Sequence, residues 1–236
     1  MTALIIGGSS GIGRALACQL ANNGNYIIIT GRRLNKLLEV KELYPNQINI
    51  IQHDVRDYKS SEKMLYDSIA LLKTIDLIIY SSGVGEPNYD LDWSKEVPTL
   101  ETNVLGAVKI YGLAYQLFKK QGFGHLVGIS SIAGIRGNRH VPAYFASKAF
   151  QINYLESLWL KGKRSKSNIF VTDVRPGFVD TDMAIGKTFW MSDTTKAAQQ
   201  IIKAIEKKKK RVYITKRWFL IALVLKILPS RLLLKM

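Results

Sequence analysis

Short apolar runs alternate with longer segments of mixed polarity along most of the chain. The apolar runs are rich in Ile, Val and Tyr and predict buried strands. They cover Ala3–Ile6, Tyr26–Thr30, Ile48–Gln52, Leu77–Tyr80, Leu126–Ile129, Ile169–Val174 and Val212–Thr215. The segments between them carry apolar residues three and four positions apart, which is typical of helices. They cover Arg14–Asn23, Lys36–Tyr44, Ser60–Lys73, Val104–Lys120, Ala146–Lys161 and Thr195–Lys207.

This alternation predicts an α/β fold with one mostly parallel sheet of about seven strands, because uniformly apolar strands need helices on both faces. Right-handed crossovers would join the strands into a doubly wound Rossmann fold, with the ligand site beyond the carboxyl ends of the strands. The chain has 236 residues, of which 47% are hydrophobic and 22% charged. These values suit a single globular domain.

The positive charge of the chain is concentrated at its end. The net charge is +16, and residues 203–236 hold 11 basic residues and 1 acidic residue, which leaves +6 for the rest. Because residues 218–234 are apolar on almost every side, we expect residues 216–236 to form an appendage to a main domain of residues 1–215. The flanking cations favour peripheral contact with an anionic membrane surface. The alternatives are packing at a subunit interface or over a substrate cleft.

Other features of the sequence exclude several classes of protein and site. Cys18 is the sole cysteine, which excludes an intramolecular disulfide framework and a cysteine metal cluster, so no metal site is predicted. No basic segment precedes the first apolar run, and no run reaches the roughly 20 residues of a spanning helix. Nucleic acid is not an expected partner, because the tail aromatics are not interleaved with the charges. We expect a cytoplasmic protein.

A glycine-rich turn follows the first predicted strand and opens the first helix. Glycines there let the backbone approach a pyrophosphate at the positive N-terminus of the helix. Glycine spacing alone is a weak signal, but its position after a first strand predicts a dinucleotide site. The turn reads Gly7-Gly8-Ser9-Ser10-Gly11-Ile12-Gly13.

The second predicted strand ends in two arginines, Arg32 and Arg33. No carboxylate is present there to bind a free ribose 2′-hydroxyl, whereas guanidinium groups suit a 2′-phosphate. The sequence therefore favours NADP(H) over NAD(H), the alternative being that both arginines are the solvated start of a helix. Asp54 and Val55, after the third strand, are candidate contacts for the adenine, or residues of a surface turn.

Tyr144 and Lys148 lie four positions apart, on one face of a helix expected to begin near Pro142. A neighbouring ammonium favours the phenolate, so we predict that the pKa of Tyr144 lies below its usual value of about 10. Alone, such a pair is usually structural. Two further motifs change this interpretation: Ser131 follows one predicted strand, and Pro176-Gly177 follows the next.

Together these motifs resemble the short-chain dehydrogenase/reductase family, and the resemblance extends from Thr2 to about Thr215. The matching residues are Gly7, Gly11 and Gly13 for the glycine motif, Asn103 for the asparagine of the fourth helix, Ser131 for the active-site serine, Tyr144 and Lys148 for Y-x-x-x-K, and Pro176-Gly177 for the P-G motif. The chain departs from the family at Ile6, where the family has threonine, and at Tyr80-Ser81-Ser82-Gly83, where it has N-N-A-G.

The resemblance implies hydride transfer between a nicotinamide and a carbonyl or alcohol carbon. Tyr144 would donate a proton to the developing alkoxide while Ser131 holds the same oxygen. Lys148 would lower the pKa of Tyr144 and hold the nicotinamide ribose. Asn103 would anchor a water that resupplies protons through Lys148.

The remaining implied contacts concern the cofactor and the substrate. Ser82, Gly83, Val179 and Thr181 complete the predicted cofactor site, Thr181 at the position that binds the carboxamide. Met183 and Trp190 belong to the segment that covers the substrate in the family, and they suggest a hydrophobic ketone or aldehyde. The family usually forms dimers or tetramers. The alternative function is a catalytically silent nucleotide-binding sensor or a membrane-surface interaction protein.

Overall fold

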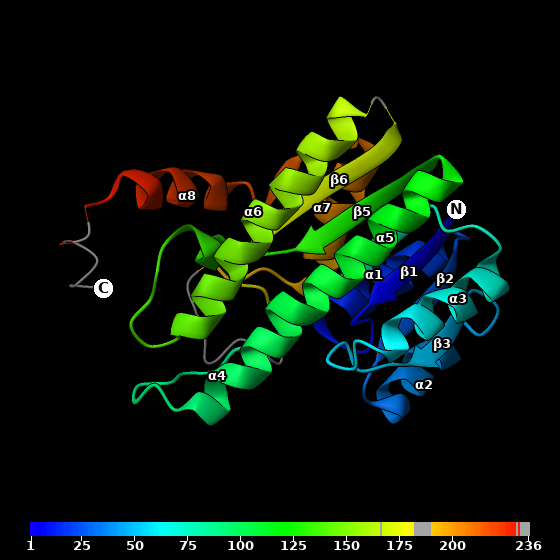
Figure 1. Cartoon of the computed structure of the whole chain (residues 1–236), viewed down its shortest axis with the longest axis horizontal. Helices are drawn as coiled ribbons and strands as arrows, with labels where there is room; N and C mark the ends of the chain where they lie inside the picture. The colour runs from blue at the N-terminus through cyan, green and yellow to red at the C-terminus, as the bar shows by residue number, and fades with distance from the viewer. Residues whose placement is uncertain (166, 182–189, 230, 232–236) are drawn as a thin grey trace.

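One sheet of seven parallel strands runs through the part of the chain that the computed structural model describes, which is residues 1–165, 167–181, 190–229 and 231 (Figure 1). Its order is β3-β2-β1-β4-β5-β6-β7, so the direction of winding reverses between β1 and β4. The doubly wound prediction is therefore confirmed. The strands are β1 (Thr2–Ile6), β2 (Tyr26–Gly31), β3 (Ile48–Gln52), β4 (Leu77–Tyr80), β5 (Phe123–Ile129), β6 (Asn168–Pro176) and β7 (Arg211–Ile214).

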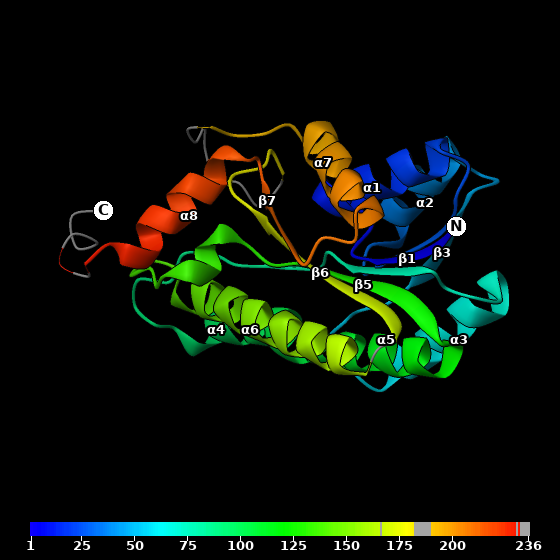
Figure 2. The same cartoon turned by 90° about the horizontal axis from the view of Figure 1, so that it is seen from above.

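Helices cover both faces of the sheet, as Figure 2 shows. On one face lie α1 (Gly11–Asn22), α2 (Leu34–Leu43) and α7 (Thr194–Glu206), and on the other α3 (Ser60–Leu72), α4 (Trp93–Leu100), α5 (Ala107–Gln121) and α6 (Pro142–Arg164). Each face has its own apolar core, one around Ile5 and Ile201 and the other around Phe118 and Leu155. Strands buried on both faces explain their uninterrupted apolar sequences.

The helical structure before Val104 was not expected. The structure has α4 followed by a π-helix, η1 (Glu101–Gly106), which continues directly into α5. Pro98 lies inside α4 and has no backbone N–H to donate, which weakens the sequence signal for a helix. Wide turns of this kind often occur at functional sites. This one carries Asn103, whose side chain is buried.

The last described helix, α8 (Arg217–Ile227), packs beyond the carboxyl end of the sheet (Figure 1). Its Trp218 is 3% exposed and packs beside Tyr213, whereas its Leu220 is 64% exposed. Arg136 fastens its C-terminal end, because the guanidinium donates to the carbonyl of Leu225 at 2.8 Å and also to that of Leu228. Of the helices described, none is long and apolar enough to cross a membrane.

Candidate active site

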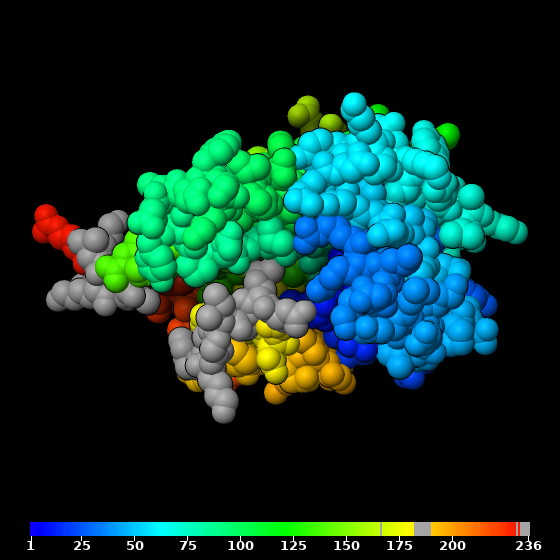
Figure 3. Space-filling model, turned by 90° about the horizontal axis from the view of Figure 1, so that it is seen from below, coloured from blue at the N-terminus to red at the C-terminus, as the bar shows by residue number. Residues whose placement is uncertain are grey.

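A cavity of about 1260 Å³ lies at the carboxyl ends of the strands. Figure 3 shows this face of the molecule, with α4 (green) on one side, the chain after β6 (yellow) on the other and α2 (blue) at one end. Seventeen of the predicted site residues line it, although they come from distant parts of the sequence. They are Gly7, Ser9, Ser10, Gly11, Ile12, Arg32, Arg33, Val55, Ser82, Gly83, Ser131, Tyr144, Lys148, Pro176, Gly177, Val179 and Thr181.

The glycine turn forms one end of the cavity. Gly7 and Gly11 have φ angles of 85° and 54°, a region that side chains rarely allow. Gly13 packs behind the turn instead of lining the cavity, and a Cβ there would lie 2.1 Å from the carbonyl oxygen of Gly7. The turn thus presents bare backbone at the N-terminus of α1, and this arrangement fits a pyrophosphate.

The two arginines lie beside this turn. The guanidinium of Arg33 donates to the hydroxyl of Ser10 at 3.0 Å, which brings positive charge to the glycine turn. His53 and Val55 line the cavity near the end of β3, and sequence reasoning missed His53. Asp54 does not line it, because its carboxylate pairs with Arg56 at 2.7 Å.

Tyr144 and Ser131 meet at the middle of the cavity. Ser131 begins the short 3-10 helix η2 (Ile132–Ile135), where its hydroxyl accepts from the N–H of Ala133 at 3.1 Å. Burial raises the pKa of Tyr144, and a hydrogen bond from Ser131 only partly opposes it. The predicted lowering of this pKa is therefore wrong: the loss of hydration outweighs the hydrogen bond from Ser131, although the ammonium of Lys148 lies 5.7 Å from the centre of the ring.

Lys148 is buried at the inner wall of the cavity. Burial lowers its pKa to about 8, and the charge of Asp173 opposes that shift. The ammonium donates to the carbonyl of Ile129 at 3.0 Å and to Oε1 of Gln151 at 3.2 Å. Asn103 lies behind this group and does not line the cavity. Its side-chain amide donates to the carbonyl of Val84 at 2.7 Å, so it braces the loop after β4.

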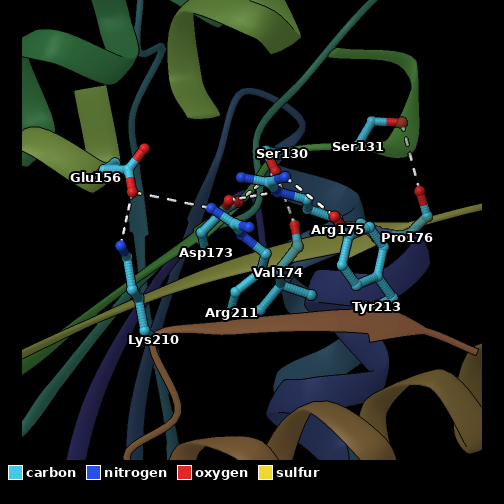
Figure 4. Close-up of polar contacts among 10 residues, drawn as sticks. All are labelled: Ser130, Ser131, Glu156, Asp173, Val174, Arg175, Pro176, Lys210, Arg211 and Tyr213. Carbon is cyan, nitrogen blue, oxygen red and sulfur yellow. Dashed lines mark hydrogen bonds and ion pairs between the residues drawn. The ribbon is translucent and has the colours of Figure 1, made fainter. Parts of the chain in front are cut away.

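A buried charged network joins the ends of β5, β6 and β7 beneath the site (Figure 4). Asp173 accepts from the Ser130 hydroxyl at 2.5 Å and from Arg175 at 2.6 Å, and Arg175 also donates to the hydroxyl of Tyr213 at 3.1 Å. Sequence reasoning missed this network, although two charges in the apolar β6 strand were a signal. It holds Ser130, and hence the neighbouring Ser131, in register with β6.

The other end of the cavity is lined largely by apolar side chains, together with Arg136, which is bonded to the end of α8. Among its lining residues are Phe145, Phe178 and, from α8, Trp218, Ile221 and Leu225. The structure thus matches the alternative in which the tail covers the cleft. Trp190 does not line the cavity; its ring packs 6.2 Å from that of Trp218. Met183 lies outside the described residues.

Comparisons with known proteins show which proteins the chain is similar to. The family model for short chain dehydrogenases matches residues 1–192. An uncharacterised oxidoreductase of Mycobacterium tuberculosis is 30% identical over 97% of this chain and 94% of its own.

Two solved structures illustrate the shared fold. A short-chain dehydrogenase/reductase from Burkholderia phymatum in complex with NAD has a TM-score of 0.86 at 16% identity, over 94% of this chain and 92% of its own. ElxO with NADP bound has a TM-score of 0.77 at 21% identity, over 86% of this chain and 90% of its own.

The glycine turn, the cavity at the switch point of the sheet and these matches lead to one conclusion. The chain belongs to the short-chain dehydrogenase/reductase family and is a nicotinamide-dependent oxidoreductase.

Proposed function

We propose that the protein reduces a hydrophobic ketone or aldehyde with NADPH, or oxidises the corresponding alcohol with NADP. The observation that carries this proposal is that Tyr144, Ser131 and Lys148 line the same cavity as the glycine turn. Residues 1–215 would be the catalytic domain and residues 216–236 an addition to it. The apolar walls that Phe178 and α8 contribute support a hydrophobic substrate.

The chain's own residues suggest how the reaction proceeds. Because burial raises the pKa of Tyr144, the phenol is protonated at neutral pH and can donate to a developing alkoxide. The Ser131 hydroxyl beside it holds the same substrate oxygen. The protonated Lys148 stabilises the phenolate that remains. A bound nicotinamide supplies or accepts the hydride.

NADP(H) is the proposed cofactor because Arg32 and Arg33 stand at the end of β2 with no carboxylate on the cavity wall there. An Arg32→Ala variant should raise the KM for NADPH far more than the KM for NADH. The same comparison with Arg33→Ala tests the guanidinium that contacts Ser10. Equal effects on both cofactors would refute the 2′-phosphate site.

Consumption of NADPH with a panel of hydrophobic ketones and aldehydes tests the reaction. Activity that disappears in Tyr144→Phe, while NADPH binding by fluorescence is retained, would support it. Tight NADPH binding without turnover of any carbonyl would favour the nucleotide-binding sensor instead. Normal turnover in Tyr144→Phe would contradict the role of the phenol.

We also propose that α8 contacts an anionic membrane at the cytoplasmic face. Its Leu220, Val224 and Ile227 are exposed, the last to 82%, and Lys216 and Lys226 flank them. Apolar side chains bordered by cations suit a peripheral contact with anionic lipid. The protein should co-sediment with vesicles containing phosphatidylserine, and Leu220→Ser with Ile227→Ser should abolish this. Binding that persists in the double variant would contradict the assignment.

A homo-oligomer is proposed by analogy with the family. The outer surface of η1 and α6 exposes Leu105, Phe150 and Leu160, which suits a contact between copies of the chain. Sedimentation equilibrium should give a dimer or tetramer. A monomer at micromolar concentration would exclude this assembly.

A further inference from the structure

Gln151 lies one helical turn after Lys148 on α6, on the side of the ammonium away from the cavity. Its side chain is 0% exposed. Its Oε1 accepts from Nζ of Lys148 at 3.2 Å, and its Nε2 donates to the backbone carbonyl of Asn103 at 2.7 Å. The amide of Gln151 therefore spans the gap between the ammonium and the π-helical turn.

The orientation of this amide is fixed by its neighbours. A lysine ammonium can only donate hydrogen bonds and a backbone carbonyl can only accept them, so the oxygen must face Lys148 and the nitrogen must face Asn103. The ammonium is also confined on another side, because a Cβ on Gly83 would lie 3.3 Å from Nζ. A second hydrogen bond of the ammonium goes to the carbonyl of Ile129.

The place that Gln151 occupies matters for proton supply. The resemblance to the family implied a water anchored by Asn103 that would pass protons to Lys148. The oxygen of a water in that position can both accept and donate a hydrogen bond, so it can pass a proton on. In the amide of Gln151 the oxygen only accepts a hydrogen bond and the nitrogen only donates one. A carboxamide in this orientation holds the two groups together without passing a proton between them.

We propose that Gln151 is a positioning residue that fixes Lys148 in the site and takes the place of a proton-relaying water between Lys148 and Asn103. The functional part of this proposal rests on the proposed reaction. The proton that Tyr144 gives to the product is then replaced from the cavity, not through Asn103.

The charged and titratable groups around Lys148 are few among the described residues. From β6, Asp173 acts on it through its charge, and Arg175 is paired with that carboxylate. From α6 itself, the phenol of Tyr144 lies beside it. Its hydrogen-bond partners are the backbone carbonyl of Ile129, from β5, and the amide of Gln151, from α6 itself, so this amide is a neutral partner that stabilises the charged form.

Titration of Lys148 in the protein without ligand tests the proposal directly. The chain is labelled with ¹³C at the lysine ε carbon, and the Lys148 signal is assigned by its absence in Lys148→Met. In Gln151→Leu a side chain of similar size that cannot accept a hydrogen bond replaces the amide. The ammonium of Lys148 loses this acceptor, and its pKa should fall by about 1. In Gln151→Ala a water can enter the vacated space and the pKa should fall by less.

Gln121→Leu is the matched control. Gln121 also bridges backbone groups, with its Nε2 bonded to the carbonyls of Ile75 and Phe123, and it lies at the far end of α5, away from Lys148. Its variant should leave the titration of Lys148 unchanged. A Lys148 pKa in folded Gln151→Leu equal to that of the unmodified protein would overturn the proposal.

Kinetics provide an independent second measurement. Once a carbonyl substrate is found, the alkaline limb of the pH profile of kcat/KM should move to lower pH in Gln151→Leu and stay in place in Gln121→Leu. If Gln151→Leu lowers kcat at every pH without moving the limb, Gln151 is merely structural. If no carbonyl is reduced, the proposed reaction fails while the NMR titration still decides the role of Gln151.

Discussion

At the scale of single residues, burial controls the protonation of both groups at the centre of the cavity. It raises the pKa of Tyr144 and lowers that of Lys148 to about 8, because in each case it disfavours the charged form. At pH 7 the tyrosine is therefore neutral and the lysine is mostly charged. This combination suits proton donation to a carbonyl oxygen.

The rate of carbonyl reduction should follow the protonation of Lys148. We expect kcat/KM to be constant below pH 7 and to decline through about pH 8, as the ammonium loses its proton. Oxidation of the alcohol, which needs the phenolate, should increase with pH. Stopped-flow measurements of NADPH absorbance between pH 6 and 10 check both directions. A reduction rate that rises through pH 8 would contradict this prediction.

His125 should make the fold sensitive to acid. Burial lowers its pKa to about 4, and the charge of Lys208 adds to this. In the unfolded chain its pKa is about 6.5, so the unfolded state binds the proton first and stability is lost as the pH falls from about 6.5 towards 4. The free energy of unfolding should drop by up to about 3 kcal/mol over this interval.

Urea unfolding at pH 8, 6 and 4.5 measures this effect. In His125→Gln, which keeps a partner for the hydroxyl of Thr172, the decline should be smaller. Equal declines in the two proteins would show that other groups cause the acid sensitivity.

At the scale of elements, the site depends on how tightly the segments after the strands pack. The turn after β1, the π-helical turn before α5 and the N-terminal turn of α6 each bring backbone within hydrogen-bond or van der Waals distance of another segment. Two glycines in helices show how different such positions can be. Gly13 in α1 faces the carbonyl of Gly7, whereas a Cβ on Gly112 in α5 would meet nothing within 4 Å.

Gly13→Ala should therefore disrupt the glycine turn. Its Cβ would lie 2.1 Å from the Gly7 oxygen, so the backbone must move, and both NADPH binding and thermal stability should fall. Gly112→Ala is the control, and it should stabilise the protein by up to about 1 kcal/mol because alanine favours a helix. Calorimetry and NADPH fluorescence measure the two effects. Unchanged NADPH binding in Gly13→Ala would contradict the assigned geometry.

The position of α8 predicts a selective effect on substrate binding. Trp218 lines the cavity and packs against Gly177, whereas Leu220 on the same helix points outward. Trp218→Ala should raise the KM for the carbonyl at least tenfold and leave the Kd for NADPH within twofold, since about 2 kcal/mol of apolar contact is lost at the substrate end alone. Leu220→Ala should change neither value. Equal losses in both variants would place α8 outside the substrate site.

At the scale of the whole molecule, the cavity spans the switch point of the sheet, so a ligand bound there contacts both halves. Ligand that binds only the folded chain stabilises it by about 2.7 kcal/mol at 100 times its Kd. Saturating NADPH should thus raise the melting temperature by several degrees, and NADH at equal concentration should raise it less. Arg33→Ala should reduce the difference between them. A larger shift with NADH would refute the cofactor preference.

Much of this architecture was predictable from the sequence. Strands such as Ile48–Gln52 and Leu77–Tyr80 have the predicted bounds, because continuous apolar runs are typical of strands covered on both faces. The helix at Trp93–Leu100 was missed, since Pro98 and its polar neighbours argue against a helix, although Asp92 caps its N-terminus by accepting from the N–H of Ser94. Helix α6 begins at Pro142, as expected for proline in a first turn.

The candidate site was predictable where a local motif carries it. Glycine spacing and Y-x-x-x-K can each be identified within one segment, and Gly7, Gly11, Tyr144 and Lys148 do line the cavity, whereas Gly13 packs behind the turn. His53, the Asp173–Arg175 pair and Gln151 could not be assigned in this way, because their significance comes from neighbours distant in the chain. The pKa of Tyr144 was predicted in the wrong direction, since the extent of its burial is a property of the folded molecule.

The last helix of the chain also gives a route to altering selectivity. Trp218, Ile221 and Leu225 contribute to the wall of the cavity, yet they belong to a segment that follows the final strand. Substitutions confined to these three positions would reshape the space available to the substrate and leave Tyr144, the proposed proton donor, unchanged. A small combinatorial library at these positions is therefore an economical way to diversify the carbonyl compounds accepted, and homologues that differ only there should differ in preference.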